Sequence, residues 1–442
     1  MPIVVSKPRN IAIVFGLLIV LIGATPVLAL GAGWLGPQLI TLIAAIMLSL
    51  LPDVPEADVR RSVAISKPLA AAALLPAAWM LLQIVPVPLG SIEHPIWRSA
   101  AAALPGAVLG HVSIDLGLTL RALFEYLSLI SLAFLTSVVA RDRDRAETLL
   151  FALCTVTTFI AVELLVRPLM TTTEFGSSHD PPDNLVALTS FGAILDVTFI
   201  VRAVERHETR SLRQPHLRRN YLGLLLAGLA GALVCLSALI HAATSSVLTA
   251  MAFGLIVLFI VVLIRRLSLR RWTAATVCAA VFVACCGVIA LQFSSNASVS
   301  PLFRFTRGEL TDAGAAPLRM LSDTGWAGAG VGNYHALAAI YRDGTGVPPP
   351  SPINTIASMI LEWGHVGLLL VAVLLLQLLV VLLRGALSRG RDWFYAASAA
   401  ACLVTIACES YCDASFTDIA VQMLAAIIVG MGLAQTVGNQ AK

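Results

Sequence analysis

Long apolar runs alternate with short polar connections along most of this chain. Each run is about 17–23 residues long, the length needed to cross the hydrocarbon core of a bilayer. The pattern predicts twelve membrane-spanning helices, at approximately 11–30, 34–51, 69–86, 118–140, 147–168, 183–203, 221–240, 244–264, 273–292, 353–383, 394–410 and 417–437. The tenth is longer than a bilayer requires, so its first turns are expected to project from the membrane.

One long polar segment, residues 293–352, interrupts this alternation. It divides the chain into spans one to nine (1–292), a loop domain (293–352) and spans ten to twelve (353–442). Loops of this length are uncommon and usually functional. The loop holds a concentration of ionisable side chains: Arg304, Arg307, Glu309, Asp312, Arg319, Asp323, His335, Arg342 and Asp343. We therefore place the candidate chemistry here.

Two short helices are predicted inside the loop. Pro317 suits a first helical position, ahead of a short helix that Gly325 closes. The glycine-rich turn 325–333 follows, and Asn333 can cap a second helix that runs to Arg342. His335 and Arg342 would share a face of that helix, because they are seven residues apart. No strand precedes the glycines, so a nucleotide-binding loop is excluded.

The helix that follows the loop begins with a polar stripe. Ser351 as N-cap and Pro352 as first helical residue predict its start. Polar side chains then recur at intervals of four, four and three residues: Asn354, Ser358, Glu362 and His365. Polar groups near hydrocarbon are costly and usually face a cavity or a partner. The plainer alternative is a helix packed on its neighbours through polar contacts.

Composition agrees with a membrane protein. Hydrophobic residues make up 58%, charged residues 12%, and the mean hydropathy is +0.89. Soluble domains carry about 25% charged residues, so a soluble globular protein is excluded. Seven of the eight cysteines lie in or near apolar runs, and no Cys or His spacing is typical of a metal site. No metal, cofactor or nucleic-acid partner is predicted.

The basic residues orient the chain. If the N-terminus is cytoplasmic, 22 of the 29 Lys and Arg residues fall on the cytoplasmic side, as the positive-inside rule requires. Both termini are then cytoplasmic and the loop faces outward, into a periplasm or its equivalent. The first apolar run resembles a signal peptide, but eleven further spans favour an uncleaved helix.

Seven arginines remain for the outward side: Arg98, Arg121, Arg167, Arg304, Arg307, Arg319 and Arg342. Arg121 either reaches the interface with its long side chain or helps to hold an anionic ligand. Three carboxylates, Glu409, Asp413 and Asp418, lie in the last outward turn. They either pair with loop arginines or orient a base, and the sequence leaves both roles open.

The order of these features resembles the O-antigen ligase/polymerase superfamily, over most of the chain by topology. The matching residues are Gly328–Tyr334 (GAGVGNY), Asn354–Gly367 with its Glu362–Gly367 stretch (EWGHVG), the turn Ser410–Asp413 and the loop Arg141–Ala146. The resemblance implies transfer of a glycan from an undecaprenyl-diphosphate carrier to an acceptor glycan or lipid. It also implies an inverting, metal-independent reaction on the outward face of a bacterial inner membrane, with arginines on the diphosphate.

Roles can be assigned on that basis. A diphosphate leaving group needs positive charge, and arginine supplies two parallel donors. We assign Arg304, Arg307 and Arg319 to the diphosphate, with Arg121 as a further candidate. The acceptor hydroxyl needs a base with a pKa near the working pH, from among His335, Glu362 and His365. His335 is preferred, with Glu362 orienting it. Supporting roles fall to Asn354, Ser358, His365, Arg342 and Asp413.

Two positions depart from the superfamily pattern. Ile353 precedes Asn354 where the superfamily commonly has histidine, and Ser245-Ser246-Val247 lacks a usual arginine. Three functions therefore stay open: a glycan ligase or polymerase, a catalytically silent scaffold for polysaccharide assembly, and a transporter of polyisoprenoid-linked glycans. Against the transporter, no internal repeat or paired broken helices are evident in the two halves.

Overall fold

The computed structural model describes residues 8–31, 35–51, 56–88, 92–105, 109–170, 182–210, 218–267, 315–342, 351–388 and 392–436. Within these ranges the chain is helical and contains no strand, apart from an isolated bridge between Val87 and Gly110. The candidate residues Arg304 and Arg307 lie outside the described residues, as does the predicted ninth span.

Eight described helices are long and apolar enough to cross a membrane by length and composition. They are α1 (Pro8–Gly31), α3 (Glu56–Ile84), α5 (Leu116–Val139), α6 (Arg143–Met170), α7 (Asp183–Arg210), α8 (Arg218–Ala242), α9 (Ser245–Arg266) and α13 (Thr355–Ser388). Three shorter apolar helices lie at further predicted spans: α2 (Leu35–Ser49), α14 (Phe394–Glu409) and α15 (Ile419–Ala434). The protein is thus an all-α, multi-pass membrane protein.

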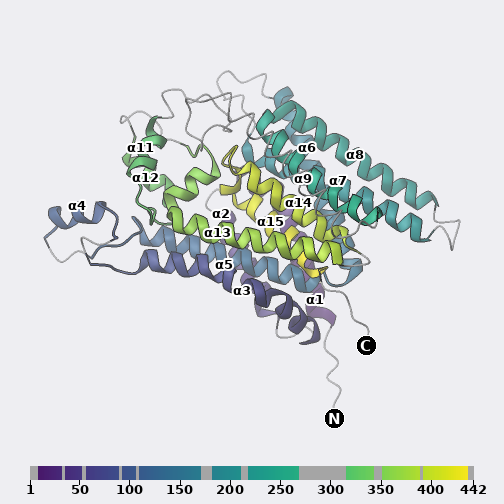
Figure 1. Cartoon of the computed structure of the whole chain (residues 1–442), viewed down its shortest axis with the longest axis horizontal. Coiled ribbons are helices and arrows are strands. Elements are labelled where there is room, and N and C mark those ends of the chain that lie inside the picture. The colour runs from purple at the N-terminus through teal and green to yellow at the C-terminus, as the bar shows by residue number, and fades with distance from the viewer. Residues whose placement is uncertain are drawn as a thin grey trace, which may run out of the picture.

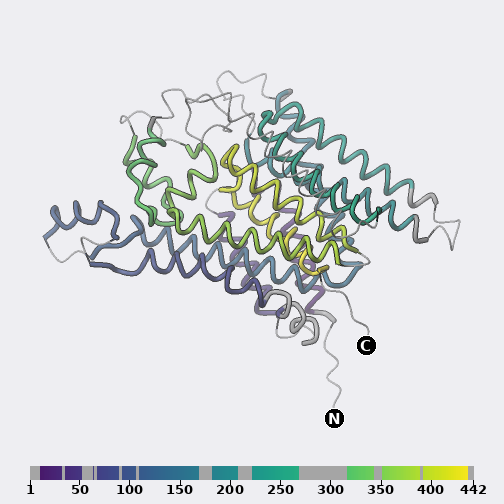
Figure 2. Tube along the Cα trace, viewed as in Figure 1, coloured from purple at the N-terminus to yellow at the C-terminus, as the bar shows by residue number. Residues whose placement is uncertain are grey.

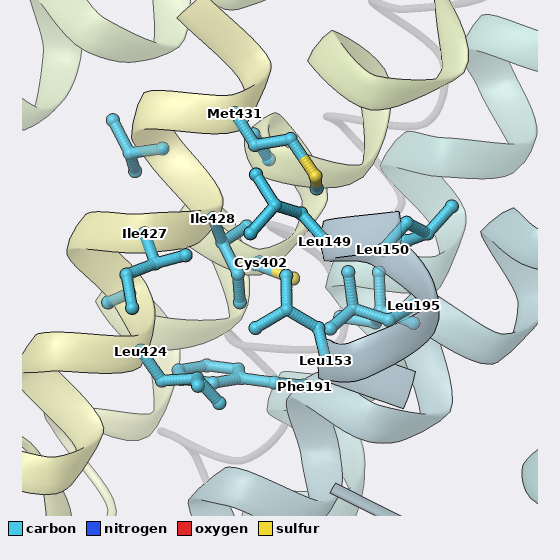
Figure 3. Close-up of a cluster of buried hydrophobic side chains, with 14 of the residues drawn as sticks. Leu149, Leu150, Leu153, Phe191, Leu195, Cys402, Leu424, Ile427, Ile428 and Met431 are labelled. Atoms are coloured by element: carbon cyan, nitrogen blue, oxygen red, sulfur yellow. The ribbon is translucent and has the colours of Figure 1, made fainter. Parts of the chain in front are cut away.

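The core lies where α6, α7, α14 and α15 meet. Leu153 of α6, Phe191 of α7, Cys402 of α14 and Leu424 of α15 pack together there (Figure 3). At 16 residues each, α14 and α15 are about 24 Å long, shorter than the roughly 30 Å hydrocarbon layer. They are apolar on all sides and almost wholly buried, as expected of helices enclosed by others (Figure 1).

Hydrogen bonds between helix ends show which ends lie together at each end of the bundle. At one end, the Asn184 amide donates hydrogen bonds to Ala29 O at 2.7 Å and to an Asp418 carboxylate oxygen at 3.0 Å. At the other, Gln435 Nε2 donates to Ala140 O at 2.6 Å. We name the first the loop end and the second the arginine end. The grouping matches the predicted up-and-down order of the described helices.

Three short helices gather at the loop end: α11 (Ala315–Asp323), α12 (Tyr334–Ile340) and the 3-10 helix η6 (Ser415–Thr417). Figure 2 shows α3, α5 and α13 running side by side toward α11 and α12. A fourth, α4 (Ile96–Ala103), projects from the bundle with no buried residue (Figure 1). It is tethered through Trp97, whose Nε1 donates to Ser113 O at 3.0 Å.

The two predicted loop helices exist, with corrections at their ends. The first begins at Ala315, ahead of Pro317. The second ends at Ile340, so Arg342 lies beyond it. The predicted helical face shared by His335 and Arg342 is therefore wrong, because the helix stops before its second full turn is complete.

Candidate functional site at the loop end

The long helix α13 is broken at Gly364. This residue has φ 68° and ψ −179°, a conformation that side chains with a Cβ rarely adopt. The break interrupts the regular hydrogen bonding of the helix, so backbone groups on both sides of Gly364 need other partners. The predicted polar stripe therefore does not continue along one helix. It stops at Glu362, and His365 begins the second helical part.

The glycine-rich turn takes up the groups that the break frees. Ala329 N donates to Leu361 O at 2.8 Å, and Gly330 N donates to Glu362 O at 3.0 Å. In return, His365 N donates to Trp326 O at 3.0 Å. The turn thus replaces the missing turn of helix with backbone hydrogen bonds from another part of the protein.

The glycines of the turn are needed for this close approach. Gly328, Gly330 and Gly332 have positive φ values of 79°, 98° and 82°. A Cβ on Gly328 would lie 2.5 Å from both Glu362 O and Gly364 N. The close approach of the turn to the backbone of α13 accounts for the glycine at this position.

Helix α3 completes the junction with two side chains. Gln83 Nε2 donates to Glu362 O at 3.1 Å and to Ala327 O at 3.0 Å. Trp79 Nε1 donates to Trp363 O at 2.8 Å. Sequence reasoning missed both residues. For Gln83 the sequence does contain a signal: an amide side chain near the end of an apolar span must find hydrogen-bond partners inside the protein.

The Glu362 carboxylate fixes the start of α12. Its Oε1 accepts a hydrogen bond from Tyr334 N at 2.8 Å, and the Gly332 N–H also donates to the carboxylate. A negative charge at a helix N-terminus is favourable, because the free N–H groups there carry partial positive charge. Burial raises the pKa of the neighbouring Tyr334 phenol, and the Glu362 charge adds to the shift. Glu362 therefore acts on α12 as a positioning residue.

His335 is the next residue along α12 and is exposed. Its ring meets the Tyr334 ring edge-on, with centroids 5.8 Å apart. Below it, Leu337 packs with Met320 of α11 and Leu361 of α13 in a small core. Glu362 thus holds the peptide beside His335, while the imidazole itself stays available to solvent.

A hydrogen bond between Tyr341 and Asp323 ties α11 to α12. The Tyr341 hydroxyl donates to Asp323 Oδ2 at 2.9 Å. Partial burial, together with this bond to Asp323, raises the pKa of Tyr341 to about 12. Asp323 is the last residue of α11, so this bond joins the end of α11 to the residue that follows α12.

Asn333 anchors the glycine turn to α5. Its Nδ2 donates to Ser113 Oγ and to Thr119 Oγ1, both at 3.0 Å. It precedes α12 as predicted, but its side chain makes no cap hydrogen bond. The prediction of a capping asparagine is wrong because Glu362 already occupies that position. The GAGVGN stretch therefore connects α3, α5, α12 and α13.

Three arginines of the candidate set are described: Arg121, Arg319 and Arg342. Arg121, in the second turn of α5, pairs with Glu125 at 2.8 Å, and both side chains are partly exposed. Glu125 lies close enough to interact electrostatically with Glu362. Arg319 on α11 and Arg342 after α12 are exposed. The structure thus places Arg121, Glu362 and His335 around one junction, while Arg319 and Arg342 belong to the loop above it.

The start of α13 has a structural explanation. The helix begins at Thr355, and Asn354 Oδ1 accepts from Ala357 N at 2.7 Å. Asn354 is therefore the cap, in place of the predicted Ser351. Carbonyl groups of the last outer turn accept the next donors: Thr355 N bonds Asp413 O at 2.9 Å, and Ile356 N bonds Ser410 O at 3.1 Å. This helix N-terminus has no donors left for an anion.

The supporting residues mostly serve this same packing. Ser358 is buried and donates to Asn354 O at 3.2 Å. Asp413 is buried and accepts from Ser415 N at 3.0 Å. Asp418 caps α15, accepting from Ala420 N at 2.8 Å, and burial raises its pKa. The contacts described for Asp413 and Asp418 thus hold a turn and a helix start, which is neither of the two roles left open for these carboxylates.

His365, the first residue after the break in α13, is exposed.

Within the described ranges, no three His, Cys, Asp or Glu side chains come together in a way that would hold a metal ion. Comparison with known proteins finds no family model and no curated protein that matches the chain.

Proposed function

We propose that this protein transfers a glycan from a polyprenyl-diphosphate carrier to an acceptor at the loop end. One observation carries the proposal. The two stretches on which the resemblance to the O-antigen ligase/polymerase superfamily depends, GAGVGNY and EWGHVG, are hydrogen-bonded to each other across the break in α13. The two stretches thus form one structural unit. In this unit Glu362 binds the backbone of Tyr334, the residue before the exposed His335.

The proposed chemistry assigns each residue a step. The acceptor hydroxyl oxygen attacks the anomeric carbon on the face opposite the diphosphate, which inverts the configuration. The carbon–oxygen bond to the diphosphate breaks, and the electron pair leaves with the diphosphate. The hydroxyl proton passes to the imidazole of His335, which acts as general base. Arginine side chains of the loop, with Arg121 as a further candidate, stabilise the departing diphosphate.

The proposal includes an orientation. The loop end faces the periplasm of a bacterial inner membrane, and both termini are cytoplasmic. Thiols introduced at Thr311 and Gly344 should then react with an impermeant reagent in intact cells, and thiols at Ser211 and Ser268 should not. Labelling of Ser268→Cys from outside would reverse the orientation and remove the site from the periplasm.

A silent scaffold is the second candidate, favoured by Ile353 in the position where the superfamily commonly has histidine. Deleting the gene and separating surface glycans by electrophoresis distinguishes the two. Complementation with wild type should restore capped or polymerised glycan, and His335→Ala at equal abundance should not. If His335→Ala and Glu362→Gln both restore the glycan pattern, the scaffold is favoured. A pattern lacking only the terminal addition indicates a ligase, and shortened chains indicate a polymerase.

A further inference from the structure

A second cluster of charged side chains lies at the arginine end, away from the proposed transfer site. Arg202 and Arg206 of α7 both pair with Glu147 of α6; Arg206 Nη1 donates to Glu147 Oε1 at 2.7 Å. Arg143 Nη2 lies 3.2 Å from Asp392 Oδ1, in the connection between α13 and α14. Together with Tyr395 of α14, these six residues form what we name the inner cluster.

The inner cluster holds more donors than acceptors. Its described members include three arginines but only two carboxylates. Arg202 is 2% exposed, and its Nε has no hydrogen-bond acceptor; Tyr395 is fully buried and its hydroxyl has no partner. Tyr395 lies within electrostatic range of all three arginines and of Asp392. Buried donors without acceptors are unfavourable, and they are normally satisfied by protein, water or a ligand.

We propose that the inner cluster binds a phosphate group, with Arg202 and Tyr395 as its buried donors. A phosphate carries negative charge and several acceptor oxygens, which matches an excess of guanidinium groups and one hydroxyl. The side chains of Arg143 and Arg206 are 30% and 20% exposed, so the cluster has an open rim. It lies at helix ends, where the headgroups of anionic lipids gather.

Two kinds of ligand carry such a phosphate group: inorganic phosphate and the headgroup of an anionic lipid. The full chain, purified in a non-ionic detergent without phosphate, is melted while its tryptophan fluorescence is followed. Sodium phosphate is compared with sodium chloride at equal ionic strength. The same melts are run in nanodiscs of phosphatidylglycerol and of phosphatidylcholine. A ligand that binds the folded protein raises its melting temperature.

Three variants locate the effect. Tyr395→Phe removes only a hydroxyl that has no partner in the structure, so its unliganded stability should equal or exceed that of wild type. It should need about tenfold more phosphate for the same shift, the usual worth of one charge-assisted hydrogen bond. Arg202→Gln should lose the shift. The control Arg266→Gln, an exposed arginine outside the cluster, should keep it.

A shift with sodium phosphate in detergent assigns the site to free phosphate, and a shift confined to phosphatidylglycerol assigns it to a headgroup. Arg202→Gln removes the buried partner of Glu147. If that variant does not fold, the phosphate titration of Tyr395→Phe alone tests the proposal. The proposal is overturned if neither phosphate source raises the wild-type melting temperature, or if Tyr395→Phe titrates like wild type.

Discussion

At the loop end, helices are joined mainly through backbone groups, whereas at the arginine end they are joined through charged side chains. The break in α13 is closed by the N–H groups of Ala329 and Gly330 and by the amide of Gln83. At the other end, α6 and α7 meet through Glu147 and two arginines.

This difference has a functional consequence. Because backbone groups close the break in α13, the packing of the loop end does not depend on the side chains of His335 and Arg319, and both stay exposed. The arginine end buries its charges, and removing one partner leaves the other without compensation. We expect substitutions of these exposed residues to alter activity at the loop end, and substitutions of the buried charges to alter stability at the arginine end. Four changes test the contrast.

The largest effect on stability is expected at Glu147. Glu147→Gln leaves Arg202, whose side chain is 3% exposed, without its carboxylate and should lower the free energy of unfolding by about 3 kcal/mol. The matched change Glu125→Gln removes the partner of Arg121 in a more exposed pair and should cost less than about 1 kcal/mol. Denaturant melts in detergent measure both. Equal losses would remove the proposed contrast between the two ends.

The next effect is expected at Gly364. A Cβ there would overlap Trp326 O, and its positive φ disfavours alanine, so Gly364→Ala should destabilise by about 2 kcal/mol. Gly23→Ala, in a helix with open space around the glycine, should be neutral or stabilising. Thermal melts compare them. A Gly364→Ala protein as stable as Gly23→Ala would show that the break is not required.

A smaller effect is expected at Glu362. Glu362→Gln keeps an oxygen that accepts from Tyr334 N but removes the charge from the start of α12. We expect a loss of about 1 kcal/mol in stability and a lower transfer rate, because α12 carries His335. The pH dependence of the residual activity should match that of wild type if Glu362 only positions the histidine. A missing ionisation in the variant would make Glu362 the base.

The smallest effect is expected at Tyr341. Its folded-state pKa is raised to about 12 from 10.0, so its contribution is complete below pH 10 and is lost as pH rises toward 12. The melting temperature of wild type should therefore fall more steeply over that window than that of Tyr341→Phe. Below pH 9 the two should differ only slightly, since the bond to Asp323 is partly exposed. Parallel curves through the window would show that the bond does not form.

The sequence predicted the helices well because span length is a direct physical requirement of the bilayer. Eleven predicted spans coincide with described helices, and α11 and α12 fall where proline, glycine and asparagine placed them. Other features could not be read from local pattern. Gly364 sits inside an apolar run, and nothing nearby in sequence shows that the helix breaks there. The break is stabilised by residues such as Gln83, far away along the chain.

The candidate site was predictable in its residue types but not in their roles. Glu362 and His335 were expected to act together, and the structure brings Glu362 to the residue beside His335. Asn333 and Ser351 were predicted as helix caps from local preference, and both predictions were wrong. Asn354 caps α13, while Asn333 binds Ser113 and Thr119. Capping preference is local, whereas both asparagines are placed by contacts with distant segments.

The most direct test of the proposed transfer is the rate of glycan transfer by His335→Ala, measured with membranes that supply the native polyprenyl-diphosphate substrate. His365→Ala is the matched control, since His365 is also exposed but follows the break. We predict that His335→Ala lowers the rate by about 10²-fold or more, the usual worth of a general base, at unchanged protein abundance. His365→Ala should stay close to wild type. Full activity of His335→Ala in this assay would contradict the account.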